Sequence, residues 1–199
     1  GLYMGTTGIV VLAASVVVGE YVSDPRTNGA SRQVTTTMLV QPRRGAAVAA
    51  KLVVVLGAAL VLLALAWAAT FSLFRHLLGP RTSFGPVPWW LLIGILMWWL
   101  FSAAAAMALA VATRSALASM AAPIAMSTMV SPGVLLIKSI DAARFLPDTA
   151  AVRLMATPTT LNYDRLIELL SVPMAAAVCA AWAGGCAVAC CWVWMRRDA

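Results

Sequence analysis

The side chains best suited to nucleophilic, redox or metal chemistry are four cysteines and one histidine. All four cysteines lie in the last apolar run, and Cys179, Cys186 and Cys190 share one helical face. Such a face suits a metal or redox site, but cysteine also packs well as a small apolar residue. The histidine, His76, lies in a polar segment with no catalytic partner beside it. The sequence therefore predicts packed cysteines and no catalytic or metal-binding residue.

Two other sources of chemistry are missing from the sequence. Ionisable residues inside membrane spans usually mark proton or ion paths, and the long apolar runs contain none. The G-x-x-x-x-G-K-[ST] loop that binds nucleotide phosphates is also absent. The sequence therefore predicts a passive bundle with no motor of its own.

The composition indicates a membrane protein. Of 199 residues, 62% are hydrophobic and only 11% are charged, against about 25% charged in soluble domains. The formal net charge is +7, but the basic residues are spread over the ends of apolar runs. This spread favours membrane topology and contact with anionic lipid over nucleic-acid binding.

Apolar runs long enough to span a membrane predict the fold. A span needs roughly 20 residues, and we expect five spans, at about 2–19, 52–74, 89–112, 115–131 and 171–195. The chain is therefore predicted to be a single all-α domain, residues 1–199, folded as a polytopic helical bundle.

Residues 20–51 form a charged, turn-rich segment between the first two predicted spans. It carries five basic and two acidic residues, and loops with such an excess stay in the cytoplasm. Asp24-Pro25 and Asn28-Gly29 indicate turns, residues 30–40 suggest a short helix, and Pro42 ends it. Two interpretations stand: a surface helix at the membrane edge, or a coupling helix that fits a partner protein.

The topology follows from this cytoplasmic segment. It places eight Lys/Arg on the cytoplasmic side of the membrane and six on the outer side, where four acidic residues accompany them, in agreement with the positive-inside rule. It also places Gly1 outside with no export signal. We therefore expect a preceding first span, so that the full subunit has six spans.

Residues 132–170 are too apolar for a solvated loop and too interrupted for a span. We predict short re-entrant helices that cap the outer end of the bundle, since irregular backbone at membrane depth must be shielded by protein. The charges of Lys138, Asp141, Arg144 and Asp148 are expected to reach headgroups or external solvent.

Trp98, Trp99 and Phe101 lie roughly 14–18 Å into their span, at 1.5 Å per residue, too deep for an interfacial belt. They either pack against lipid and neighbouring helices or line a pathway for an apolar or aromatic substrate. The small residues that follow, Ala103–Ala106, allow close helix approach.

The charged segment and its flanks resemble a known family. Gly19-Glu20 closes one span, Pro42-Arg43-Arg44 ends the short helix, and Lys51 enters the next span. This order, with Phe145-Leu146-Pro147 in the outer segment, is similar to the permease subunit of ABC-2 type transporters. Relative to that pattern, Val22–Asn28 looks like an insertion.

The resemblance implies a multi-pass permease of the cytoplasmic membrane that exports a lipophilic drug, antibiotic or lipid-like substrate. It implies a second permease copy, or a homologous one, and a separate ATPase subunit that holds ATP and Mg²⁺. The residues expected to couple to that ATPase are Glu20, Arg32, Pro42, Arg43 and Arg44. The alternative is a non-transport receptor or scaffold that docks a cytoplasmic partner.

Overall fold

The computed structural model describes residues 5–19, 44–78, 89–127, 132–137, 139–155 and 170–196. Every regular element among these residues is a helix, and none of them forms a strand. The predicted all-α class is therefore confirmed for the described part of the chain.

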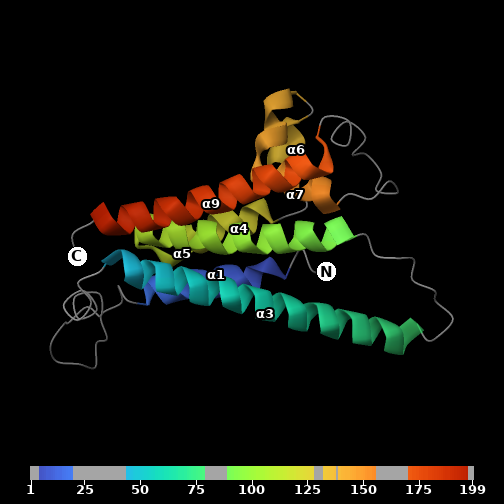
Figure 1. Cartoon of the computed structure of the whole chain (residues 1–199), viewed down its shortest axis with the longest axis horizontal. Helices are drawn as coiled ribbons and strands as arrows, with labels where there is room; N and C mark the ends of the chain where they lie inside the picture. The colour runs from blue at the N-terminus through green and yellow to red at the C-terminus, as the bar shows by residue number, and fades with distance from the viewer. Residues whose placement is uncertain are drawn as a thin grey trace.

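Five helices form the bundle: α1 (Thr6–Val18), α3 (Arg44–Leu78), α4 (Trp89–Thr113), α5 (Ala116–Met126) and α9 (Val172–Arg196). Three short elements lie beside them: α6 (Pro132–Leu136), the 3₁₀ helix η1 (Asp141–Phe145) and α7 (Pro147–Met155). We call α6, η1 and α7 together the cap. They stand at an angle to the bundle near one of its ends (Figure 1).

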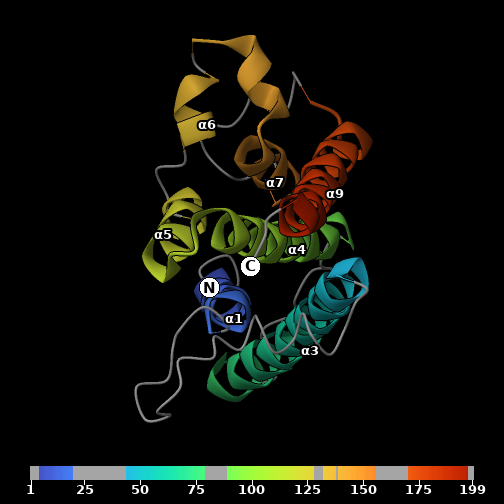
Figure 2. The same cartoon turned by 90° about the vertical axis from the view of Figure 1, so that its left-hand side faces the viewer.

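Helix α4 is the centre of the bundle. It packs against α1, α3, α5, α7 and α9, which surround it in the end-on view (Figure 2). In an 18-residue apolar stretch of α4, 56% of the residues are buried, against 17% in the corresponding stretches of α3 and α9. Its alanines make this possible, since Ala103, Ala106 and Ala110 are fully buried and let neighbouring backbones approach closely.

Three helices are long and apolar enough to cross a membrane: Gly45–Leu77, Trp90–Thr113 and Val172–Arg196. Helices α1 and α5 have 13 and 11 residues, so they are about 20 and 16 Å long. Both fall short of the roughly 30 Å of a bilayer's hydrocarbon. By length the described residues thus support three spans, where the sequence predicts five.

The first long helix begins earlier than predicted. Helix α3 starts at Arg44 and continues to Leu78, whereas the sequence places residues up to Lys51 in the cytoplasmic segment. The reason is local: no proline occurs between Pro42 and Pro80, and the alanines of 46–50 favour helix. The helix predicted over residues 30–40 lies outside the described residues.

A sharp turn separates α4 from α5. Arg114 has a positive φ of 54°, and the Ser115 side chain caps α5 by accepting a hydrogen bond from the Ala118 backbone N–H at 3.4 Å. The helix ends at Met126, short of the predicted 131, where the Ser127 hydroxyl donates to the Pro123 carbonyl at 2.8 Å. The Thr6 hydroxyl lies 3.2 Å from that of Ser127, which joins α1 to the end of α5.

The helix directions bring four helix ends together. Helices α4 and α9 run the same way and α3 runs opposite to them (Figure 1). The end of α1, the start of α3 and the ends of α4 and α9 therefore share one end of the bundle (Figure 1). We call it the basic end, because the topology predicted from the sequence places these helix ends on the cytoplasmic side, where basic residues are in excess. The cap lies at the other end, which we call the cap end.

Candidate functional site

The predicted coupling residues fall largely outside the described part of the chain. Glu20, Arg32, Pro42 and Arg43 lie in residues 20–43, and Arg44 is described only as the first residue of α3. Their coupling role stays a prediction. What the structure adds is the position of the two helix ends that flank this segment.

At the basic end, the start of α3 packs against the end of α9. The Lys51 ammonium lies 5.3 Å from the ring centroid of Trp194, close enough for a cation–π interaction. A Cβ placed on Gly45 would lie 3.5 Å from the Met195 sulfur. The two helices therefore meet directly where residues 20–43 rejoin the bundle.

The two tryptophans near the end of α9 differ in their surroundings. Trp192 is half exposed, with the Arg196 guanidinium 4.2 Å from its ring, as expected of an interfacial anchor. Trp194 also lies at the end of a predicted span, where the sequence predicts an interfacial anchor, yet it is 3% exposed. That expectation is wrong because Lys51 and α3 cover its ring within the bundle.

The aromatic side chains proposed for a substrate pathway are packed inside the bundle. Trp98, Trp99 and Phe101 belong to the main core cluster and are 1%, 3% and 4% exposed. The rings of Trp98 and Phe101 lie 5.5 Å apart, tilted by 39°. In this conformation they pack against neighbouring helices, and a pathway role stays a prediction.

The cap is held together by a buried carboxylate. Asp148 is fully buried and accepts a hydrogen bond from the Gly133 backbone N–H at 2.7 Å and another from Thr149 N–H at 2.9 Å. The Thr149 hydroxyl lies 2.7 and 2.8 Å from the carbonyls of Ala143 and Leu146. These contacts tie α6 and η1 to the first turn of α7. The sequence expectation that Asp148 reaches solvent or headgroups is therefore wrong.

The cap is also fixed to the bundle. The indole N–H of Trp182 in α9 donates to the Phe145 carbonyl at 2.8 Å, and the Arg153 Nε donates to the Leu170 carbonyl at 2.7 Å. Partial burial lowers the pKa of Arg153, but an arginine stays charged at neutral pH. On α4, a Cβ placed on Gly94 would lie 2.6 Å from the Leu154 Cβ. Helix α7 thus rests directly on the backbone of α4.

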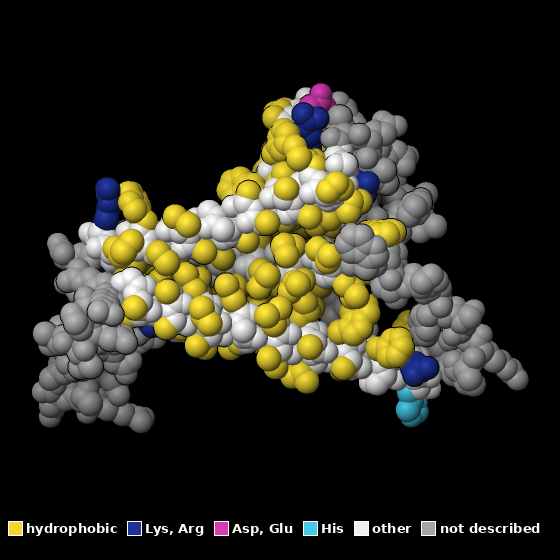
Figure 3. All heavy atoms as spheres, in the orientation of Figure 1, with side chains coloured by type: hydrophobic (Ala, Val, Ile, Leu, Met, Phe, Trp, Pro, Cys, Tyr) yellow, Lys and Arg dark blue, Asp and Glu magenta, His cyan; other side chains and the backbone are white. Residues whose placement is uncertain are grey.

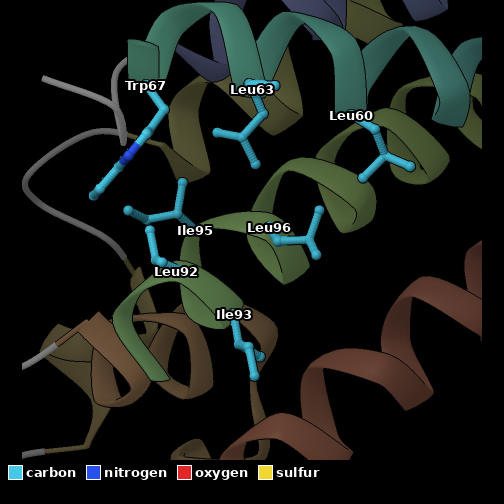
Figure 4. A pocket seen from close by; sticks show the side chains of 8 residues that line it. Leu60, Leu63, Trp67, Leu92, Ile93, Ile95 and Leu96 are labelled. Atoms are coloured by element: carbon cyan, nitrogen blue, oxygen red, sulfur yellow. The ribbon is translucent and has the colours of Figure 1, made fainter. Parts of the chain in front are cut away.

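An apolar groove lies between α3 and α4 (Figure 4). Its volume is about 360 Å³, and its lining residues are Leu60, Leu63, Ala64 and Trp67 of α3 with Leu92, Ile93, Ile95 and Leu96 of α4. Such a volume falls within the range of small-molecule pockets, about 300–1,000 Å³. Since every lining side chain is apolar apart from one indole N–H, the groove suits hydrocarbon. We call it the α3/α4 groove.

The described residues offer little for bond-making chemistry. No group of three or more His, Cys, Asp or Glu side chains among them could hold a metal ion. Cys179 and Cys190 are buried in the core, in agreement with the packing interpretation. His76 is exposed in the last turn of α3. What the described arrangement offers is apolar surface that can bind apolar groups.

Sequence reasoning missed the contacts that the fold creates between distant segments. The α3/α4 groove combines residues about 30 positions apart, and no pattern in either helix alone predicts it. Gly94 did carry a signal, as a single glycine in a run of large apolar residues, because such glycines often mark close backbone approach. Trp182 gave none, since its acceptor is a backbone carbonyl.

Comparison with models of protein families, with curated proteins and with solved structures finds no match. Function is therefore argued from the residues of this chain and their geometry.

Proposed function

We propose that this chain is the permease subunit of an ATP-driven exporter in the cytoplasmic membrane. A separate ATPase subunit would bind residues 20–43, and a second permease copy would complete the pathway. The substrate class is lipophilic, because the predicted spans hold no ionisable side chain that could pair with a charged substrate. The chain itself carries out no bond chemistry.

The continuity of α3 supports this proposal. Residues 20–43 end at Arg44, where one unbroken helix of 35 residues begins. At 1.5 Å per residue that helix is about 52 Å long. A push on residues 20–43 would therefore be carried along α3, past Lys51 and Trp194, to the α3/α4 groove and beyond.

The loose packing of α3 supports a moving role as well. Its half nearest the basic end is partly buried, through Val48, Leu52, Val55 and Ala59, while residues 68–77 are all exposed. Elements with few buried contacts belong to the less stable and more mobile parts of proteins. Helix α4, by contrast, is the buried centre against which α3 could tilt.

The test is reconstitution with an ATPase subunit that copurifies with this chain from its native membrane. The two proteins are co-purified and placed in proteoliposomes, where ATP hydrolysis and export of a lipophilic dye are both measured. We expect the chain to change the ATPase rate, and dye export to require ATP. Copurification without ATP-dependent export would favour the receptor or scaffold alternative.

A charge reversal in the coupling segment sharpens this test. The double variant Arg43→Glu with Arg44→Glu should hydrolyse ATP but lose export, since the contact surface changes while the spans remain. The matched control is Arg196→Glu with Arg197→Glu, which reverses two adjacent arginines that the predicted topology places on the same side of the membrane. Normal export by the first variant would exclude a coupling role for these arginines.

A further inference from the structure

We infer that the α3/α4 groove binds one acyl chain of an anionic phospholipid whose headgroup is held by Arg75. The inference requires only that the chain lies in a membrane, and it does not depend on the proposed transport. It rests on three observations: an apolar groove on a spanning helix, a stripe of side chains that extends the groove, and a guanidinium at the end of that stripe.

The groove is accessible from the side of the bundle. Leu60 and Leu92, on its two walls, are 48% and 39% exposed, whereas Ile95 at its base is 6% exposed. In the close view Leu60, Leu63 and Trp67 extend from α3 toward α4 (Figure 4). On a helix long enough to cross the bilayer, this opening faces hydrocarbon, so an acyl chain is the molecule at hand to fill it.

The groove side of α3 continues toward the end of the helix. Leu60, Leu63 and Trp67 are followed by Phe71 and Phe74, at the spacings of three and four residues that keep side chains on one helical face. Phe71 and Phe74 are 44% and 42% exposed. An acyl chain that leaves the groove past Trp67 therefore meets two further aromatic rings rather than polar groups.

Arg75 stands at the end of this stripe, four residues after Phe71. Its guanidinium carbon lies 5.2 Å from the Phe71 ring centroid, which holds the charge on the same side as the groove. Along the axis it lies about 12 Å beyond Trp67. The space-filling view shows the basic and histidine side chains at that end of α3, beyond the apolar surface (Figure 3). Apolar stripe and terminal cation together match an anionic phospholipid, with its chain in the groove and its phosphate at Arg75.

The inference is tested by photocrosslinking in nanodiscs. Phosphatidylglycerol and phosphatidylcholine, each with the same photoreactive acyl chain, are added to the purified full chain at equal mole fraction, and crosslinked peptides are mapped by mass spectrometry. We expect crosslinks on residues 60–67 and 92–96, with phosphatidylglycerol favoured about fivefold, the equivalent of about 1 kcal/mol for one basic residue at a membrane surface.

Two variants, each with a matched control, distinguish binding of the acyl chain from binding of the headgroup. Ala64→Phe fills the groove and should remove its crosslinks with both lipids, whereas Ala69→Phe, the same change on the exposed opposite face, should leave them unchanged. Arg75→Gln should abolish the phosphatidylglycerol preference but keep the crosslinks, and Arg196→Gln should not alter that preference. Arg75 is exposed at a helix end, so Arg75→Gln should fold normally. It therefore tests whether Arg75 holds the headgroup even if Ala64→Phe fails to fold.

Three outcomes would overturn the inference. Crosslinks spread evenly around α3 would mean ordinary annular lipid. A phosphatidylglycerol preference unchanged in Arg75→Gln would remove Arg75 from the site. Absence of lipid crosslinks, with disulfide formation between copies carrying Leu63→Cys, would mean that a second copy of the chain covers the groove.

Discussion

Two glycines permit close contacts, one within the cap and one between the cap and the bundle. A Cβ on Gly133 would clash with the Asp148 carboxylate, and one on Gly94 would lie 2.6 Å from the Leu154 Cβ. Real Cβ atoms do not approach other atoms so closely, so neither position tolerates a larger residue without movement. At Gly133 the missing side chain lets the carboxylate reach the backbone N–H.

Replacement of Gly94 by alanine should loosen the cap. The added methyl group must push α7 away from α4, and overpacking of this kind costs about 1–3 kcal/mol. The control is Gly57→Ala in α3, where nothing lies within 4 Å of an added Cβ and the change should be neutral or stabilising by up to about 1 kcal/mol. Thermal unfolding of the purified variants in detergent measures both, and equal melting temperatures would contradict the close contact.

Individual residues were the hardest part to predict from the sequence. Asp148 is a charged residue directly after a proline, so exposure is the natural expectation. It is buried because a backbone N–H 15 residues earlier and the first turn of its own helix satisfy its oxygens. Trp194 is buried because a lysine from another helix lies over it. In both cases the partner is set by the tertiary fold.

Helix α9 is joined to the cap by the side-chain hydrogen bond of Trp182, and that bond can be removed. Trp182→Phe deletes the N–H that donates to Phe145 and keeps most of the ring. The loss should cost about 0.5–1.5 kcal/mol and raise the opening of the cap up to about tenfold. The measurement is the thiol-labelling rate of Ala143→Cys in a background whose native cysteines are replaced.

The matched control for this change is Trp192→Phe. It makes the same substitution near the end of α9, and that end of the helix lies away from the cap (Figure 1). Its labelling rate at position 143 should equal that of the parent protein. If the two tryptophan variants behave alike, the bond between α9 and η1 does not hold the cap closed.

Two neighbouring alanines of η1 report on the structure of the cap itself. Ala142 is exposed, whereas Ala143 is 3% exposed in a small cluster with Ile137. With cysteine at each position in turn, an aqueous thiol reagent should label position 142 at least about tenfold faster than position 143. Equal and fast labelling would mean an ordinary solvated loop.

The elements were predicted better than the residues. Short helices in residues 132–170 follow from apolar runs that charges and prolines interrupt, and α6, η1 and α7 agree with this expectation. The errors lie at helix ends. Helix α3 begins eight residues early because alanine favours helix as readily outside a membrane as inside. Helix α5 ends early because Ser127 bonds back to Pro123.

For the whole molecule, the directions of the helices constrain the topology more strongly than their lengths do. Helices α4 and α9 run the same way (Figure 1), and contacts at both ends agree. Near the cap end, Gly94 of α4 and Cys179 of α9 both face α7, the latter with its sulfur 3.8 Å from the Pro147 carbonyl. Toward the basic end, Ala108 of α4 lines the same depression as Ala189 of α9.

Parallel helices require a return of the chain between them. The chain leaves α4 at Arg114, at the basic end, and enters α9 at the cap end, so residues 114–171 must travel the length of the bundle. Helix α5 provides about 16 Å of that path, roughly half the hydrocarbon thickness. This supports a membrane crossing between Arg114 and the cap, even though α5 alone is too short to span.

That crossing can be tested by the side from which single cysteines react. In a cysteine-free background, Arg114→Cys and Ala142→Cys are each exposed and lie on either side of the expected crossing. An impermeant thiol reagent added to intact cells should label position 142 at once and position 114 only after permeabilisation, because the positive-inside rule places the basic end in the cytoplasm. Labelling of both positions from one side would mean that α5 and the cap form a hairpin on a single surface, and α4 and α9 could not then both cross in the same direction.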